Sequence, residues 1–283
     1  MTKIAFITDS TAYLQGEFAT KHNIKVVPLN LHWDNETFKD NVDITAQAFY
    51  ERLEKSNSIP TTSQPSSGEF LAAFNESSRG AEALVAVLIS SGISGTLDSA
   101  LMAKKEFNQI PLEVVDSKVT SAGLALLIKA MTAVAEKDGS VDDVVRMGKR
   151  VFDTMGVFFV VDTLKYLHKG GRIGGASAFL GSALDLKPIL YLSAEGKIEA
   201  LEKVRTKKKA VNRLIDIAVE KTGGKKAHVG IMQANALEGA QAIKAELEKR
   251  MDLVELEIYE LSPVIGTHAG PGTLGIAVHT TEY

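Results

Sequence analysis

Cysteine is absent from the 283-residue sequence. Its absence excludes disulfide bonds, thiol nucleophiles and thiolate metal ligands, and it fits a reducing compartment. No apolar stretch is long enough to span a bilayer, and the amino-terminal residues enter a strand-like run in place of the longer apolar segment of a signal peptide. We therefore expect a cytoplasmic protein without stable membrane insertion.

An excess of positive charge is missing as well. The sequence has 32 Lys and Arg against 35 Asp and Glu, which gives a formal net charge of -3 and a pI near 6.1. No global positive field is available to hold nucleic acid, and the scattered histidines show no metal-ligand spacing. We therefore expect neither a nucleic-acid partner nor a metal site, and small ligands and protein partners remain.

Short apolar runs alternate with helical patterns in the first half of the chain. This alternation is typical of βαβ units, in which a mainly parallel sheet has flanking helices. The predicted strands are Ile4–Thr8, Glu82–Ile89 and Leu112–Val115. The predicted helices, from apolar residues at helical spacing, are Ala46–Lys55, Phe70–Ser77, Leu97–Phe107, Ala122–Glu136 and Val141–Asp153.

Strand patterns dominate from about Val157 onward. The residues Ala-Glu-Gly-Lys between Leu192 and Ile198 favour a hairpin turn, so part of this second sheet should be antiparallel. Because the length exceeds that of one usual domain, we predict a two-domain α/β protein: a mainly parallel domain at 1–155 and a mixed domain with antiparallel strands at 156–283. The predicted strands are Val157–Val161, Pro188–Leu192, Ile198–Val204, Ala227–Gln233, Val254–Leu261 and Leu274–His279, with helices at Lys207–Lys221 and Leu237–Lys249.

The segment Ser90–Thr96 follows a predicted buried strand and precedes a predicted helix. Ligands of open α/β sheets bind at this position, at the carboxyl end of a strand. Its glycines allow close approach to the backbone, and Ser94 and Thr96 place hydroxyls beside the free N–H groups of a helix start. The segment suits an anion; the alternative is a plain Ser/Thr helix cap.

A serine hydrolase is the alternative reading of the same segment. Gly92–Thr96 departs by one residue, Thr96, from the Gly-x-Ser-x-Gly nucleophile elbow, with Ser94 as the nucleophile. The elbow also needs a histidine and an acid downstream. Four histidines follow Ser94, but no spacing pairs one of them with an acid. An acyl-ester hydrolase therefore stays as the second hypothesis.

Two further segments offer hydrogen-bonding side chains. Ile59–Ser66 holds Thr61, Thr62 and Ser63 between two prolines that keep the backbone extended; the alternative is a linker that ends in a helix cap. Gly266–Gly275 contains a Gly-x-Gly-x-x-Gly pattern, but dinucleotide binding also requires a helix after it and an acid further on, whereas only a final strand and eight residues follow Gly275. We expect His268 to be exposed in this glycine-rich loop, where it can donate to a carboxylate or form ordinary polar surface.

Two arginines lie in candidate anion-contacting segments. Arg172 belongs to Lys169–Gly175, which lacks the phosphate-loop pattern and is predicted to be a helix stop and turn. Arg205 belongs to the densest basic run, at a predicted strand end and helix start. This run is either a solvated face or a docking patch for an acidic or phosphate-bearing partner.

Six blocks of the sequence together carry a resemblance to one known family. They are Thr8–Thr11, Thr61–Ser66, Ser90–Thr96, Gly171–Ile173, Lys203–Lys207 and the segment around His268. In order and nearly in spacing they resemble the DegV family, the fatty-acid-binding subunits of bacterial fatty acid kinases. The resemblance runs from the first predicted strand to the last.

The resemblance implies a non-catalytic subunit that holds one long-chain fatty acid in a tunnel between its two domains, with no other cofactor. A separate kinase subunit, similar to dihydroxyacetone kinases, would phosphorylate the bound carboxylate with ATP to an acyl-phosphate. By the same resemblance Thr62, Ser94 and His268 would bind the carboxylate, with Thr61 and Ser63 as neighbours that can share this role. Arg172 and Arg205 would face the kinase or the acyl-phosphate.

Overall fold

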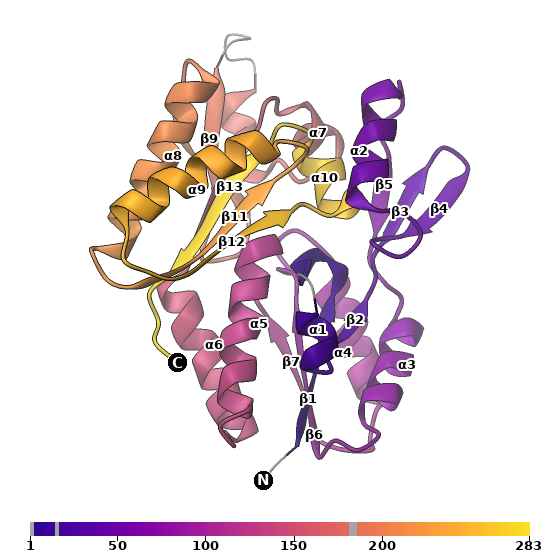
Figure 1. Cartoon of the computed structure of the whole chain (residues 1–283). Coiled ribbons are helices and arrows are strands. Elements are labelled where there is room, and N and C mark those ends of the chain that lie inside the picture. Colours follow the sequence, from indigo (N-terminus) through magenta and orange to yellow (C-terminus); the bar gives the residue numbers. More distant parts are fainter. Residues whose placement is uncertain (1–2, 15–16, 181–185) are drawn as a thin grey trace.

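The computed structural model describes residues 3–14, 17–180 and 186–283 and shows two α/β domains, one below the other (Figure 1). The lower domain contains a parallel sheet and the upper domain a mixed sheet, as predicted. The predicted strands and helices all occur, most of them displaced by only one or two residues at their ends and at most by three. The exact boundary at residues 155 and 156 stays a prediction.

The lower sheet is parallel throughout, with strand order β2-β1-β6-β7. Its central strand β6 is buried along its whole length because helices cover both faces: α3 and α4 pack on one face and α5 on the other. A continuous apolar run is what such a doubly covered strand requires. The bounds are β1 Ile4–Asp9, β2 Lys25–Val27, β6 Ala83–Leu88, β7 Leu112–Asp116, α3 Ser67–Ser77, α4 Thr96–Glu106 and α5 Ser121–Ala135, with the short helices η1 Ser10–Ala12 and α1 Phe18–Lys21 after β1.

The upper sheet is mixed, with strand order β10-β9-β8-β13-β11-β12. Only the β11–β12 pair is parallel, and β9 and β10 form the predicted antiparallel hairpin. Helices α8 and α9 cover its outer face. The bounds are β8 Gly156–Val160, β9 Lys187–Leu192, β10 Ile198–Val204, β11 Ala227–Gln233, β12 Leu253–Glu260, β13 Leu274–His279, α8 Lys207–Thr222 and α9 Leu237–Arg250; α6 Val141–Thr154, α7 Lys165–Lys169, η2 Gly174–Phe179 and α10 Pro263–Ala269 complete the set.

A third sheet was not predicted. It is antiparallel, with order β4-β3-β5, and it lies with α2 beside α10 from the other end of the chain (Figure 1). The hydroxyl of Tyr50 in α2 donates to the carbonyl oxygen of Leu261 at 3.0 Å, and the carboxylate of buried Asp40 accepts from the N–H of Val264 at 3.1 Å. These residues from the first half of the chain therefore pack against the upper domain. The bounds are β3 Asn30–Trp33, β4 Glu36–Lys39, β5 Thr61–Ser63 and α2 Ala46–Lys55.

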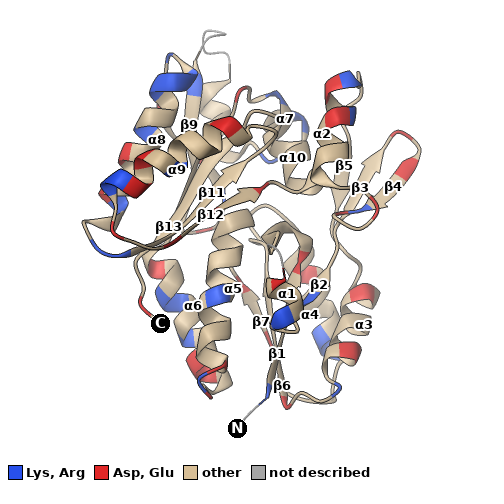
Figure 2. Cartoon of the chain, in the orientation of Figure 1, with Lys and Arg blue, Asp and Glu red and all other residues tan. Residues whose placement is uncertain are grey.

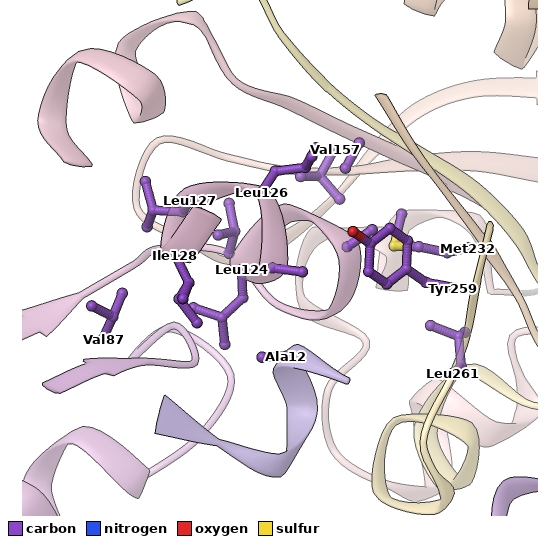
Figure 3. Packing of buried hydrophobic residues seen from close by; sticks show 14 of the residues in the cluster. Ala12, Val87, Leu124, Leu126, Leu127, Ile128, Val157, Met232, Tyr259 and Leu261 are labelled. Atoms are coloured by element: carbon purple, nitrogen blue, oxygen red, sulfur yellow. The ribbon is translucent and has the colours of Figure 1, made fainter. Parts of the chain in front are cut away.

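Helix α5 packs between the two large sheets. Figure 3 shows its residue Leu126 beside Val157 of the upper sheet, and Ile128 on the side of Val87 of the lower sheet. The close packing depends on a glycine of β11, because a Cβ on Gly230 would lie 2.6 Å from the Cβ of Ala122. One hydrophobic cluster thus joins both sheets, so their relative position is held by buried apolar contact.

Charged residues lie mainly in the helices and in the loops between elements (Figure 2). Basic residues gather at the beginning of α8, where Lys207, Lys208 and Lys209 follow one another. Within the described ranges no helix is long and apolar enough to cross a bilayer.

Candidate functional site

An apolar cavity lies between the two sheets. Its interior offers about 90 Å³ to a water-sized sphere, within a surrounding space of about 850 Å³ that includes open solvent. Its walls come from the loop after β6, from β5, from the start of α5, from the inner face of the upper sheet and from α10. Apolar wall residues include Ile93, Val157, Phe159, Met232 and Leu261.

Thr62 and His268 meet at the wall of this cavity. The hydroxyl of Thr62 in β5 lies 2.7 Å from Nε2 of His268, although 206 residues separate them in the sequence. His268 was expected in an exposed glycine-rich loop, and this expectation is wrong: the residue lies in α10 and is only partly exposed. Ser262 caps α10 by accepting from the N–H of Ile265 at 3.4 Å, and Pro263 occupies the first helical position.

The imidazole of His268 is held in its neutral form. Burial, with a smaller contribution from the positive charge of Arg172, lowers the pKa of His268 to about 4. Nδ1 of His268 is buried and has no hydrogen-bond partner among the described residues. The ring packs against the end of α7, since a Cβ on Gly170 would lie 2.1 Å from this Nδ1 atom. A neutral imidazole can still donate one hydrogen bond to an anion.

Ser94 and Arg172 line the same cavity from a neighbouring wall. The hydroxyl of Ser94 lies 2.8 Å from that of Thr96 and accepts from the N–H of Thr96 at 3.3 Å, beside the start of α4. Nε of Arg172 donates to the carbonyl of Ile93 at 3.1 Å, and Nη1 donates to that of Gly170 at 2.8 Å. These bonds join the turn after α7 to the Ser94 loop. The cavity therefore combines apolar walls with hydroxyls, a neutral imidazole and one positive charge.

Thr61, Ser63 and Arg205 do not direct a free polar group into the cavity. Successive side chains of a strand point to opposite faces, so Thr61 and Ser63 share the face opposite Thr62. Thr61 is exposed and does not line the cavity. Ser63 does line it, but its hydroxyl contacts Nε2 of His32 at 2.8 Å. Arg205 is exposed just beyond the end of β10, seven residues from the wall residue Ile198, or roughly 20 Å along an extended strand.

No histidine hydrogen-bonds the hydroxyl of Ser94 in the part of the chain that the structure describes. The nearest candidate on the same cavity, His268, instead contacts Thr62 through Nε2, and its Nδ1 contacts no carboxylate. A Ser-His-acid relay needs both of these bonds. The geometry therefore gives the hydrolase hypothesis no support.

Gln64, Thr120 and Ser121 are among the polar wall residues that were missed in the sequence. Gln64 packs against the Ser94 loop, since a Cβ on Gly95 would lie 2.6 Å from its Nε2 atom. The alternation of an extended strand was a usable signal, because it places Gln64 on the face of Thr62. Thr120 and Ser121 line the cavity at the start of α5. They follow β7 at the carboxyl edge of the lower sheet, where ligands of α/β proteins bind.

Comparison with known proteins gives one consistent result. A family model described as uncharacterised proteins of the DegV family matches residues 3–281. Protein DegV of Bacillus subtilis is 35% identical over 275 residues, which cover 96% of this chain and 98% of that relative.

Two solved structures extend this result to three dimensions. A DegV family protein from Thermus thermophilus, described by its fatty acid binding, matches with a TM-score of 0.94 and 32% identity, covering 99% of this chain and 100% of that one. A stearic acid-binding protein from Eubacterium ventriosum matches with a TM-score of 0.88 and 26% identity, covering 99% of this chain and 98% of that one.

Proposed function

The chain belongs to the DegV family, and we propose that it binds one long-chain fatty acid in the cavity between its two sheets. The observation that carries the proposal is the pairing of a largely apolar cavity with hydrogen-bonding side chains at its wall. The similar proteins from Thermus thermophilus and Eubacterium ventriosum, described as binding a fatty acid and stearic acid, support it.

The acyl chain would supply most of the affinity. Burial of one methylene gains about 0.8 kcal/mol, so about a dozen methylenes would contribute on the order of 10 kcal/mol before the cost of ordering the ligand. Neutral donors add roughly 1 kcal/mol each. The tail therefore determines how tightly the ligand binds, and the head group determines its orientation.

The carboxylate would bind between Thr62, Ser94 and His268. Each offers one donor, and the carboxylate has room for several. Because burial and Arg172 keep the pKa of His268 near 4, the imidazole would donate as a neutral group at pH 7. Arg172 would supply the only nearby positive charge among the described wall residues. Thr61 would act only indirectly, through the strand that carries Thr62.

The bound acid would then be presented to a partner. We propose that a separate kinase subunit, similar to dihydroxyacetone kinases, phosphorylates the carboxylate with ATP, and that this chain does not catalyse the step. Arg172 at the cavity would face the acyl-phosphate. The exposed Arg205 next to the basic start of α8 (Figure 2) would contact the kinase, because a basic patch is complementary to an acidic surface.

Native mass spectrometry and titration calorimetry test the binding. Protein purified from bacteria should carry an added mass equal to one fatty acid, and delipidated protein should bind palmitate more tightly than hexadecan-1-ol. Thr62→Val and Ser94→Ala should each weaken palmitate binding about 5- to 10-fold and affect the alcohol less. A delipidated protein that binds neither palmitate nor oleate would refute the proposal. Incubation with a serine-directed fluorophosphonate should leave Ser94 unlabelled, which separates the carrier from a hydrolase.

A further inference from the structure

A second polar spot lies inside the same apolar cavity, at the amino end of α5. The hydroxyl oxygens of Thr120 and Ser121 are buried and have no hydrogen-bond partner in the described parts of the chain, although both residues line the cavity. Ser121 is only 2% exposed. Thr120 precedes the 15-residue helix α5 but makes no side-chain capping bond to it. Neither hydroxyl is therefore used by the fold.

The unpaired, buried hydroxyls of Thr120 and Ser121 can form hydrogen bonds with a polar group of a ligand. Nearly all buried polar groups in native proteins have a partner, and an exception commonly marks a binding site or an ordered water. The first N–H groups of a helix also lack an intrahelical partner, so donors and acceptors converge at the start of α5. Ser121 also has a φ of +52°, a left-handed conformation that non-glycine residues adopt at some cost.

We propose that Thr120 and Ser121 bind an oxygen substituent on the acyl chain, so that the cavity accepts hydroxy or keto fatty acids. A hydroxyl group both donates and accepts, which suits a neutral alcohol or ketone and requires no charge. The cavity wall also carries apolar residues such as Val157 and Met232. An oxygen elsewhere along the chain would lie unpaired against such residues, so the spot selects the position of the substituent.

This inference rests on the proposed fatty acid binding and adds a specificity to it. The test is calorimetric titration of delipidated protein with stearate and with positional isomers of hydroxystearate, from the third to the twelfth carbon. At least one isomer should bind no more weakly than stearate, whereas the others should bind on the order of 10-fold more weakly because their hydroxyl is buried without a partner.

Thr120→Val combined with Ser121→Ala should reverse this preference. The double variant should bind the favoured isomer on the order of 10-fold more weakly than the wild type and stearate severalfold more tightly, because the wall has become apolar. Thr132→Val is the matched control: Thr132 is a further buried, unpaired hydroxyl of α5 that does not line the cavity, so this variant should keep the wild-type preference. If the double variant does not fold, Thr120→Val alone, which preserves the shape of the side chain, replaces it.

Two results would overturn the inference while leaving the proposed function in place. One is stearate binding with every hydroxy isomer at least about 10-fold weaker, which would mean that the two hydroxyls hold water only. The other is an isomer preference that the double variant retains. Failure of stearate, palmitate and oleate alike to bind would instead refute the proposed function.

Discussion

Replacing Gly170 by alanine should weaken the head-group site without unfolding the protein. Gly170 ends α7 with a φ of −76° and a ψ of −5°, a backbone conformation that alanine adopts freely. An added Cβ would lie 2.1 Å from Nδ1 and 2.8 Å from Cε1 of His268. The imidazole must therefore move, and its 2.7 Å contact with Thr62 must lengthen or break.

The size of the effect follows from the bond that is lost. A hydrogen bond from a neutral donor contributes about 1–1.5 kcal/mol, so losing the one from His268 to a carboxylate should raise the dissociation constant of palmitate about 5- to 10-fold, as for the donors of Thr62 and Ser94. Hexadecan-1-ol has no charge and should lose much less. Calorimetric titration of delipidated wild type and Gly170→Ala with both ligands measures this difference.

Gly68→Ala provides the control for the glycine-to-alanine change. Gly68 lies in α3, and the nearest heavy atom to an added Cβ is Oγ of Ser66 at 3.9 Å, so the variant should bind both ligands like the wild type. Palmitate binding by a folded Gly170→Ala protein within about twofold of the wild-type value would show that His268 does not bind the carboxylate.

Three further predictions concern stability. Asp40→Ala removes the acceptor of Ser10 and of the Val264 N–H, and because it leaves buried groups unpaired it should lower the free energy of unfolding in urea by about 2–4 kcal/mol. Burial, and to a smaller extent the charge of His228, lowers the pKa of His279 to about 3, although the negative charge of Glu255 acts in the opposite direction. His279 of the unfolded chain binds a proton near pH 6.5, whereas in the folded chain it stays neutral down to about pH 3. The free energy of unfolding should therefore fall as the pH is lowered from about 6.5 to 3, and His279→Gln should reduce this fall by on the order of 4 kcal/mol. An equal fall in both proteins would contradict the assignment. Removal of the lipid should lower the melting temperature, and readdition of palmitate should restore it.

The larger elements of the fold were predictable because their patterns are long. β6 is a fully apolar run and α6 has a strongly amphipathic sequence, so each reads as one element whatever surrounds it. The sheet β4-β3-β5 was missed because its strands have three or four residues and half-exposed, largely polar sequences such as Thr61–Ser63. Such short strands depend on tertiary contacts, here with α10, that no local pattern contains.

The proposed head-group residues were predicted by resemblance, whereas their geometry was not. The glycines of Gly266–Gly275 suggested a loop around His268, yet Ser262 followed by Pro263 is an ordinary start signal for a helix. That signal would have placed His268 inside α10. The opposite orientation of Thr61 and Thr62 was also predictable, because it follows once the segment is recognised as a strand. The unpaired hydroxyls of Thr120 and Ser121 were out of reach, since a lack of partners is a property of the folded interior alone.

Val157, Met232 and Leu261 belong both to the hydrophobic cluster around α5 (Figure 3) and to the wall of the cavity. An acyl tail in that space would extend the hydrophobic interior of the folded protein. Ligand binding and folding would then be thermodynamically coupled. A ligand at 100 times its dissociation constant stabilises the native state by about 2.7 kcal/mol, and a change of about 1–2 kcal/mol can alter cellular abundance severalfold. A shortage of free fatty acid would then leave the protein less stable and more open to proteolysis, so that its abundance would fall with the supply of its ligand.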